Sequence, residues 1–195
     1  RVLKHKGYDK IQLQRDGEKL SYYEVLPTIL QGIELRDYQI EAIHKLLASK
    51  RGVAKMATNS GKTEIFASMI KALNFPQTLI LVTRKELMYQ TVDRLKLRFN
   101  NWSIVGMIGD GKIQPATITV GMIQTLYRMS EEELNKLFFG NQVIILDECY
   151  HGSAEKSLEV LEHIPGYYRY GFSGTPLRDK VLPDLKLIAY TGEIV

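Results

Sequence analysis

The chain has 195 residues, of which 45% are hydrophobic and 25% charged, the composition of one globular domain or of one domain with a small appendage. This composition excludes a disordered chain, a collagen-like repeat and a disulfide scaffold, and no apolar run approaches the ~20 residues that cross a bilayer. The formal net charge of +4, from 26 basic and 22 acidic residues, permits a polyanionic partner without requiring one.

The cysteine content bears on the cellular compartment. Cys149 is the single cysteine, so neither an intrachain disulfide nor a multi-cysteine metal site is expected. We therefore expect a reducing, intracellular setting, the cytoplasm of a bacterium or of the host of a virus, with no membrane as partner. Because the sequence begins with Arg1 rather than Met, we also expect it to be a fragment or a processed product.

Residues 1–33 are predicted to form a small β-rich appendage. Polar and apolar residues alternate over 10–14, the pair Asp16-Gly17 follows, and extended character resumes over 18–23. Asp-Gly between two such runs favours a hairpin, because both central residues of the turn need a positive φ.

Residues 34–195 alternate between helical and strand patterns. Apolar residues recur at helical spacing over 38–47, 64–73 and 85–99, and Ser130 is a predicted N-cap before three glutamates. Short apolar strands are predicted at 52–56, 78–82, 104–108, 117–120, 143–146 and 170–172. This alternation predicts an α/β domain with a mostly parallel central sheet and helices on both faces. Ligands of such sheets bind beyond the carboxyl ends of the strands, so we expect the chemistry in the loops there.

The loop after the first of these strands has the features of a phosphate-binding site. It reads Ala57-Thr58-Asn59-Ser60-Gly61-Lys62-Thr63 and leads into a helix. Gly61 lets the backbone approach a phosphate, Lys62 supplies a charge for the β- and γ-phosphates, and Thr63 offers a hydroxyl to Mg²⁺. Met56 stands where the first glycine of the full phosphate-loop pattern would be. An ordinary strand–turn–helix corner is the alternative interpretation of this loop taken alone.

A second loop places two carboxylates at the end of a buried strand. Asp147 and Glu148 directly follow the apolar run 143–146. Asp147 is placed to hold Mg²⁺ (through water), and Glu148 to orient the attacking water. A strand end whose charges simply reach solvent is the alternative, and it loses weight because the Gly-Lys-Thr loop occurs in the same domain.

Together these motifs resemble those of the first RecA-like motor domain of superfamily 2 DNA helicases and translocases of the DExH type, in particular repair and branch-migration helicases. The resemblance covers 34–195 and rests on the order and spacing of the motifs. Residues 34–39 resemble the adenine-recognition motif, 57–63 motif I, and Asp147-Glu148 motif II. Residues 83–90 resemble motif Ia, 109–111 with 118–126 the motif Ib and Ic region, and 173–178 motif III.

The resemblance implies a RecA-like P-loop ATPase domain over 34–195 that uses ATP and Mg²⁺ to move on or remodel DNA, single-stranded or branched, with RNA as the alternative strand. Lys62, Asp147 and Glu148 would be catalytic, and Thr63 and Asp147 would hold the Mg²⁺. The nucleotide would be bound by Arg36, Gln39, Thr58, Asn59, Ser60, Gly61, Lys62 and Thr63. The nucleic acid would be bound by Thr83, Arg84, Lys85, Gly111, Lys112 and Thr125. The nucleotide state would be passed to the strand by Tyr150, His151, Ser173 and Thr175.

The sequence departs from the family pattern at two positions. Asn59 stands where motif I usually has glycine, and asparagine tolerates left-handed backbone. Tyr150 stands where motif II usually has histidine, which here comes one residue later, at His151. These departures bear on the coupling of the nucleotide site to the nucleic-acid-binding surface more than on the hydrolysis of ATP. The family's second RecA-like domain, with its arginine fingers, is absent from these residues, so the isolated chain is expected to hydrolyse ATP poorly.

Three other functions remain open on the sequence alone. They are a nucleotide-dependent nucleic-acid-binding module without productive hydrolysis, the motor subunit of a restriction enzyme, and an RNA helicase. A small-molecule kinase is disfavoured by Glu148 beside Asp147. Arg36 is interpreted equally well as stacking on adenine or as a solvated residue at a helix start. Tyr38 and Trp102 are expected to pack in the core.

Overall fold

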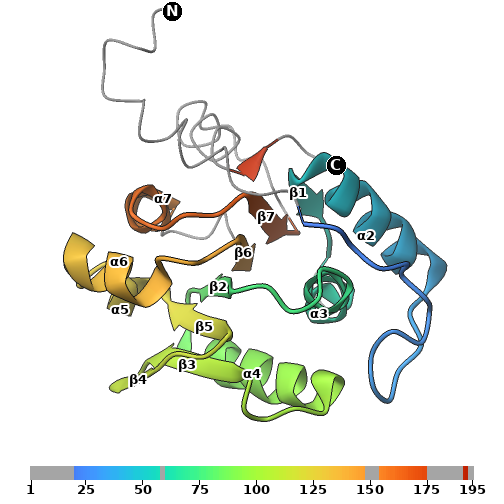
Figure 1. The fold of residues 1–195 in the computed structure, drawn as a ribbon, viewed down its shortest axis with the longest axis horizontal. Helices are drawn as coiled ribbons and strands as arrows, with labels where there is room; N and C mark the ends of the chain where they lie inside the picture. The colour runs from blue at the N-terminus through green and yellow to red at the C-terminus, as the bar shows by residue number, and fades with distance from the viewer. Residues whose placement is uncertain (1–19, 58–59, 148–153, 175–190, 193–195) are drawn as a thin grey trace, which may run out of the picture.

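The computed structural model describes residues 20–57, 60–147, 154–174 and 191–192, and the hairpin predicted around Asp16-Gly17 lies outside them. In these ranges the chain forms a seven-stranded sheet in the order β1-β7-β6-β2-β5-β3-β4 (Figure 1). All neighbouring strands are parallel except β3 and β4, which are antiparallel. The strands are β1 (Arg51–Lys55), β2 (Thr78–Val82), β3 (Val105–Gly109), β4 (Lys112–Gln114), β5 (Ile118–Met122), β6 (Val143–Asp147) and β7 (Tyr168–Ser173).

Helices cover both faces of this sheet. One face carries α2 (Asp37–Ser49), α3 (Lys62–Ala72) and α4 (Lys85–Phe99), with α3 between the other two (Figure 1). The other face carries α5 (Ile123–Leu126), α6 (Glu131–Phe138) and α7 (Ala154–Glu162). The architecture is therefore the α/β fold with a mostly parallel sheet that the alternation of patterns predicts, and it agrees with the RecA-like domain that the resemblance implies.

Strand β2 shows why the sheet is buried on both sides. All five of its residues are buried, and successive side chains of a strand point to opposite faces. Ile80 and Val82 join the core under α2, α3 and α4, whereas Leu79 and Leu81 join the core under α5, α6 and α7. A continuous apolar run is the pattern that such two-sided burial requires.

Helix α3 is buried around almost its whole circumference. Residues 64–70 and Ala72 are all buried, and the Phe66 ring meets the Phe172 ring of β7 edge to face, with 5.7 Å between centroids. Full burial of such a side chain contributes about 1.5–3 kcal/mol. The start of this helix, at Gly61 and Lys62, is thereby fixed against the sheet.

Most predicted elements are present within a few residues of their predicted limits. The N-cap at Ser130 is confirmed: its Oγ accepts from the Glu133 N–H at 3.3 Å, and Glu133 Oε2 accepts from the Ser130 N–H at 2.8 Å. This capping box lowers the pKa of Glu133, mainly through the bond from the Ser130 N–H. Helices α5 and α7 and strand β4 were not predicted.

Two predicted core residues are exposed instead, and for both the prediction is wrong. Trp102 is 68% exposed in the turn between α4 and β3, where Asn101 Oδ1 accepts from the Ser103 N–H at 3.1 Å. The turn directs the ring outward, and Lys96 Nζ lies 5.4 Å from its centroid. Tyr38 is 41% exposed because its hydroxyl reaches across to the loop before α3.

The described part of the stretch before α2 packs onto the α/β body. Val25 and Leu30 are buried and belong to the core on the α2, α3 and α4 side of the sheet. The Tyr23 N–H donates to the Ala72 carbonyl at 2.8 Å, and the Tyr168 hydroxyl donates to the Leu20 carbonyl at 3.1 Å. Of the helices in the described ranges, none is long and apolar enough to span a membrane.

Candidate nucleotide and nucleic-acid site

The loop between β1 and α3 ends in a conformation that favours glycine. Gly61 has a φ of +81° and is the N-cap residue of α3. A Cβ at this position would collide with Nε2 of Gln39. The first N–H groups of α3 have no intrahelical partner, and they form the kind of site that binds a phosphate.

Lys62 and Asp147 approach each other at the carboxyl edge of the sheet. Lys62 opens α3 and Asp147 ends β6, and Lys62 Nζ lies 3.9 Å from Asp147 Oδ1. Both side chains are nearly buried, with 10% and 9% of their surface exposed. The distance exceeds the 2.7–2.9 Å of a direct charge-assisted hydrogen bond. A cation and a carboxylate are thus held side by side at the end of the phosphate loop.

The oxygen donors at this edge fit a magnesium ion that arrives with phosphate. Mg²⁺ is bound by one or two protein oxygens together with phosphate oxygens and water, rather than by an all-protein cage. Asp147 supplies a carboxylate, and Thr63, in the first turn of α3, supplies a half-buried hydroxyl. Within the described ranges, no group of three His, Cys, Asp or Glu residues is placed to hold a metal ion.

A hollow of about 200 Å³ lies beside the phosphate loop. One wall comes from Ile33, Glu34 and Arg36, just before α2, and the other from the loop and first turn of α3, at Ser60, Gly61 and Glu64. Gln39 completes the lining. The hollow therefore adjoins the phosphate-binding loop on the side where the upstream motif, 34–39, was predicted to hold adenine.

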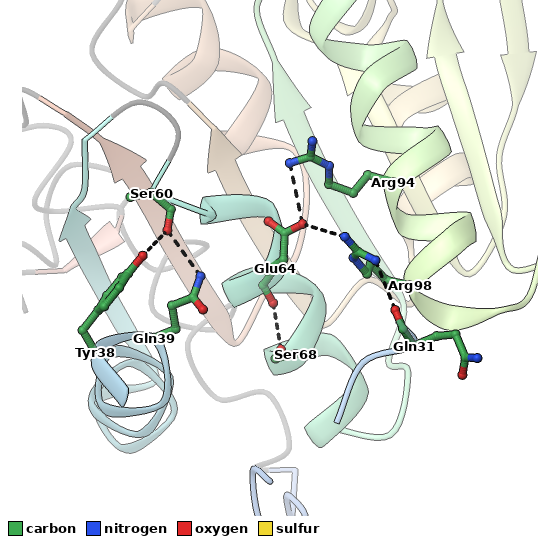
Figure 2. Close-up of polar contacts among 8 residues, drawn as sticks. All are labelled: Gln31, Tyr38, Gln39, Ser60, Glu64, Ser68, Arg94 and Arg98. Atoms are coloured by element: carbon green, nitrogen blue, oxygen red, sulfur yellow. Dashed lines mark hydrogen bonds and ion pairs between the residues drawn. The ribbon is translucent and has the colours of Figure 1, made fainter. Parts of the chain in front are cut away.

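Two side chains of α2 hold the loop through a single oxygen (Figure 2). The Tyr38 hydroxyl donates to the Ser60 carbonyl at 2.8 Å, and Gln39 Nε2 donates to the same oxygen at 3.3 Å. Gln39 Oε1 accepts from the Arg36 N–H at 2.9 Å. Within the described residues, these bonds engage one hydrogen and one lone pair of the Gln39 amide, and a primary amide carries a second of each. Arg36 is exposed, with Nη1 at 3.5 Å from the Tyr38 hydroxyl.

Glu64 is a buried carboxylate that the sequence analysis missed. It lies in the first turn of α3, and its Oε1 is 3.6 Å from Arg94 Nη1 and 3.6 Å from Arg98 Nη2, both on α4 (Figure 2). Its Oε2 is buried and makes no hydrogen bond within the described residues. The available signal was the pair of arginines four residues apart, which share one face of a helix.

The end of β7 lies against the beginning of the phosphate loop. The Met56 N–H donates to the Ser173 carbonyl at 2.8 Å, and Ser173 is 1% exposed. The backbone of Gly174 is close enough that a Cβ there would lie 3.5 Å from the Met56 carbonyl oxygen. Ser173, predicted to pass on the nucleotide state, is therefore brought to the phosphate loop.

The residues predicted to contact nucleic acid gather farther along the same sheet. Arg84 and Lys85 are exposed at the start of α4, directly after β2, and the Thr83 carbonyl accepts from Gln124 Nε2 at 2.9 Å. Gly111 and Lys112 are exposed at the turn between β3 and β4. Thr125 is half-buried in α5.

Tyr89 joins helix α4 to that turn and was not predicted. Its hydroxyl donates to Asp110 Oδ2 at 3.0 Å, and Lys112 Nζ lies 5.0 Å from its ring centroid. The arrangement holds Lys112 beside the helix that carries Arg84 and Lys85. Six other predicted site residues, Thr58, Asn59, Glu148, Tyr150, His151 and Thr175, lie outside the described residues.

Residues 32–178 match the sequence family described as the res subunit of type III restriction enzymes. The chain is 34% identical over 155 residues to the DNA 3'-5' translocase XPB2 of Sulfurisphaera tokodaii, with 78% of this chain and 33% of that protein covered. It is 33% identical over 147 residues to the ATP-dependent helicase IRC3 of Saccharomyces cerevisiae, with 66% of this chain and 21% of that protein covered.

Among solved structures, the UvsW helicase from bacteriophage T4 has the same fold, with a TM-score of 0.72 at 18% identity over 96% of this chain and 66% of that one. The chain thus spans about a third of the archaeal translocase and about a fifth of the yeast helicase. The chain belongs to the family matched over residues 32–178, and it is a first RecA-like domain of the superfamily 2 helicases.

Proposed function

We propose that this chain is the nucleotide-binding half of an ATP-driven DNA motor. The observation that carries the proposal is the approach of Lys62 and Asp147 to 3.9 Å at the start of α3. It supports a site where a cation and a metal-binding carboxylate act on the same phosphates. A second RecA-like domain, supplied by the remainder of a longer protein, would close on this one. Residues 34–195 would form the motor domain and 1–33 its appendage.

The phosphate end of the nucleotide would be held by the loop from Thr58 to Thr63, with Lys62 neutralising the β- and γ-phosphates. Mg²⁺ would be held by Thr63 and Asp147 and would neutralise the charge that develops on the transferred phosphoryl group. Glu148 would orient the attacking water. The hollow beside the loop would receive the base, with the free hydrogen and lone pair of the Gln39 amide facing it.

The nucleic-acid strand would lie over the exposed start of α4 and the turn between β3 and β4. Arg84 and Lys85 oppose the helix dipole at an N-terminus, and a nearby polyanion is a physical reason for cations there. Lys112 and Gly111 would contact the backbone of the same strand. Ser173 and Thr175, with Tyr150 and His151, would relay the nucleotide state. DNA is favoured because the archaeal relative is named a DNA translocase.

A restriction-enzyme motor subunit is the second candidate function. The matched family carries that description over residues 32–178, which supports it. Both candidates share the ATP-driven movement on DNA. They differ in whether the complete protein also assembles with, or contains, a nuclease that cuts the DNA.

The proposal is tested by measuring ATP hydrolysis with Mg²⁺ in the presence of single-stranded DNA, branched DNA, RNA, or no nucleic acid. The full-length protein is compared with Lys62→Ala and Glu148→Gln variants. DNA-stimulated turnover that both substitutions abolish, with ATP binding kept in Glu148→Gln, is the expected result. ATP binding without turnover under any condition would instead identify a nucleotide-dependent binding module, and stimulation by RNA alone would identify an RNA motor.

A further inference from the structure

Gln31 and Arg98 are joined by two reciprocal hydrogen bonds. The Gln31 N–H donates to the Arg98 carbonyl at 3.0 Å, and Arg98 Nη1 donates to the Gln31 carbonyl at 3.2 Å (Figure 2). Gly32 follows with a φ of +71°, and a Cβ there would lie 3.7 Å from the same Nη1. The last turn of α4 thus holds the chain at the point where it turns toward Ile33 and Glu34.

The same guanidinium reaches the other wall of the hollow. Arg98 Nη2 lies 3.6 Å from Glu64 Oε1, and the two side chains are only 16% and 10% exposed. A guanidinium is a rigid planar fork with donors in fixed directions, so one arginine can hold two acceptors at a set separation. Here its acceptors are Gln31, next to the upstream wall, and Glu64, in the α3 wall.

We propose that Arg98 is a positioning residue for the base end of the nucleotide site. It stands behind the hollow, holds Gln31 and Glu64 together, and so sets the spacing between the Ile33–Glu34 wall and the first turn of α3. The inference rests on the proposed function, because it takes the hollow as the place where the base binds. It adds a residue from α4 that touches neither the base nor the phosphates.

Arg94 provides a matched comparison on the same helix. Its Nη1 lies 3.6 Å from the same Glu64 Oε1, but its side chain is 52% exposed. Water competes for the exposed Arg94 guanidinium, so its pair with the buried Glu64 is expected to contribute less than the pair with Arg98. Both substitutions to glutamine remove one positive charge beside Glu64, whereas only the Arg98 substitution removes the donor that the structure gives to the Gln31 carbonyl.

Because Arg98 acts on the base end, its loss is expected to separate base binding from phosphate binding. A general loss of charge beside Glu64 changes the affinity for any polyphosphate, with or without a base. A change in the spacing of the two walls changes only the part of the affinity that the base provides. The dissociation constant for inorganic tripolyphosphate divided by the dissociation constant for ATP therefore isolates the proposed role. This ratio falls when the base contributes less to binding.

The test measures both dissociation constants, with Mg²⁺ present, by titration calorimetry on the full chain. We expect Arg98→Gln to lower the ratio about ten-fold, which corresponds to about 1.4 kcal/mol of the binding free energy that the base provides. Arg98→Lys keeps the charge but loses the fork, and is expected to lower the ratio as well. Arg94→Gln is expected to leave the ratio within about two-fold.

Equal ratios in the wild type and both Arg98 variants would overturn the inference, whatever happens to the individual affinities. An equal decrease in Arg98→Gln and Arg94→Gln, with no change in Arg98→Lys, would assign the effect to charge alone and would also overturn it. Thermal unfolding of each variant identifies any that fails to fold, in which case the milder Arg98→Lys decides. A wild type that binds neither ligand would overturn the proposed nucleotide site itself.

Discussion

Gln39, in the first turn of α2, donates to the carbonyl oxygen of Ser60 at 3.3 Å and so links two segments that lie 21 residues apart. The bond makes the position of the phosphate loop depend on the upstream motif. It also gives Gln39 two roles, one in holding the loop and one, under the proposed function, in contacting the base. Variants of the two donors to Ser60 distinguish these roles.

Gln39→Leu is expected to weaken ATP binding about ten-fold, whereas Tyr38→Phe is expected to change it by less than about three-fold. Both remove a donor to Ser60, but Gln39 is 6% exposed and also accepts from the Arg36 N–H, whereas Tyr38 is 41% exposed. Leaving a buried group without its partner costs about 1–3 kcal/mol, more than losing a solvated bond. Titration calorimetry measures both constants. Equal losses would show that holding Ser60 is the whole role of Gln39.

Gly61→Ala is expected to weaken nucleotide binding at least about ten-fold, because left-handed backbone costs a non-glycine residue roughly 1–2 kcal/mol. The added Cβ would also collide with Gln39 Nε2. Gly111→Ala is the matched control, since Gly111 has a φ of +74° but open space around the added Cβ. The affinities are measured without nucleic acid. If both variants bind ATP as the wild type does, the loop before α3 is not the nucleotide site.

Arg84→Gln combined with Lys85→Gln is expected to weaken single-stranded DNA binding and to make it less dependent on salt. Each lost phosphate contact lowers the slope of log K against log salt by about 0.7 for a single strand. Lys136→Gln, an exposed position on α6 across the sheet, is the control. Fluorescence anisotropy at several salt concentrations gives the slopes. An unchanged slope in the double variant would show that the nucleic-acid strand binds to another surface of the protein.

Phe66→Ala is expected to lower the free energy of unfolding by about 3–5 kcal/mol. Phe66 is fully buried, and its ring packs edge to face on Phe172. Phe139→Ala removes a ring that is 87% exposed and is expected to change stability by about 0.5 kcal/mol or less. Urea unfolding followed by circular dichroism measures both. Similar effects of the two changes would contradict the burial of α3.

Glu133→Gln is expected to lower the melting temperature at pH 7 but not at strongly acidic pH. The bonds from Ser130 hold the pKa of Glu133 below its ordinary value of 4.5, so the folded state favours the ionised form. That stabilisation is complete above the unfolded pKa and is lost as the pH falls through the folded one. Melting curves from pH 7 to pH 2 measure the difference. Glu132→Gln, which removes the neighbouring carboxylate of the same turn, is the control.

The strands and the phosphate loop could be predicted because their signals are local. An apolar run such as 78–82 defines a buried strand by itself, and parallel strands bring their carboxyl ends to one edge. Lys62 and Asp147, 85 residues apart, were therefore expected at the same edge, and the structure places them there. Strand β4 was missed because its three residues are all exposed and carry no apolar pattern.

The contacts that Glu64 makes with α4 could not be predicted, because they depend on how α3 and α4 pack. Glu64 follows a phosphate loop, and an acidic residue in a first turn is ordinarily explained by the helix dipole. The spacing of Arg94 and Arg98 places them on one face of a helix, but it shows neither that Glu64 is buried nor that either arginine reaches it. The prediction that Trp102 packs in the core was wrong for a similar reason, since the turn at Asn101 decides where the ring points. Residue type alone does not encode that direction.

Strand β4 ends the sheet on the side opposite the phosphate loop, with three exposed residues, and Pro115 follows it at once. Exposed sheet edges are templates on which other chains can add a strand, and short edges with a lysine and a proline are poor ones. Lys112, a proposed contact for nucleic acid, thus also bears on how the edge of the sheet behaves. It helps to keep neighbouring molecules from extending the sheet, and so guards the protein against fibre-like association when it is concentrated.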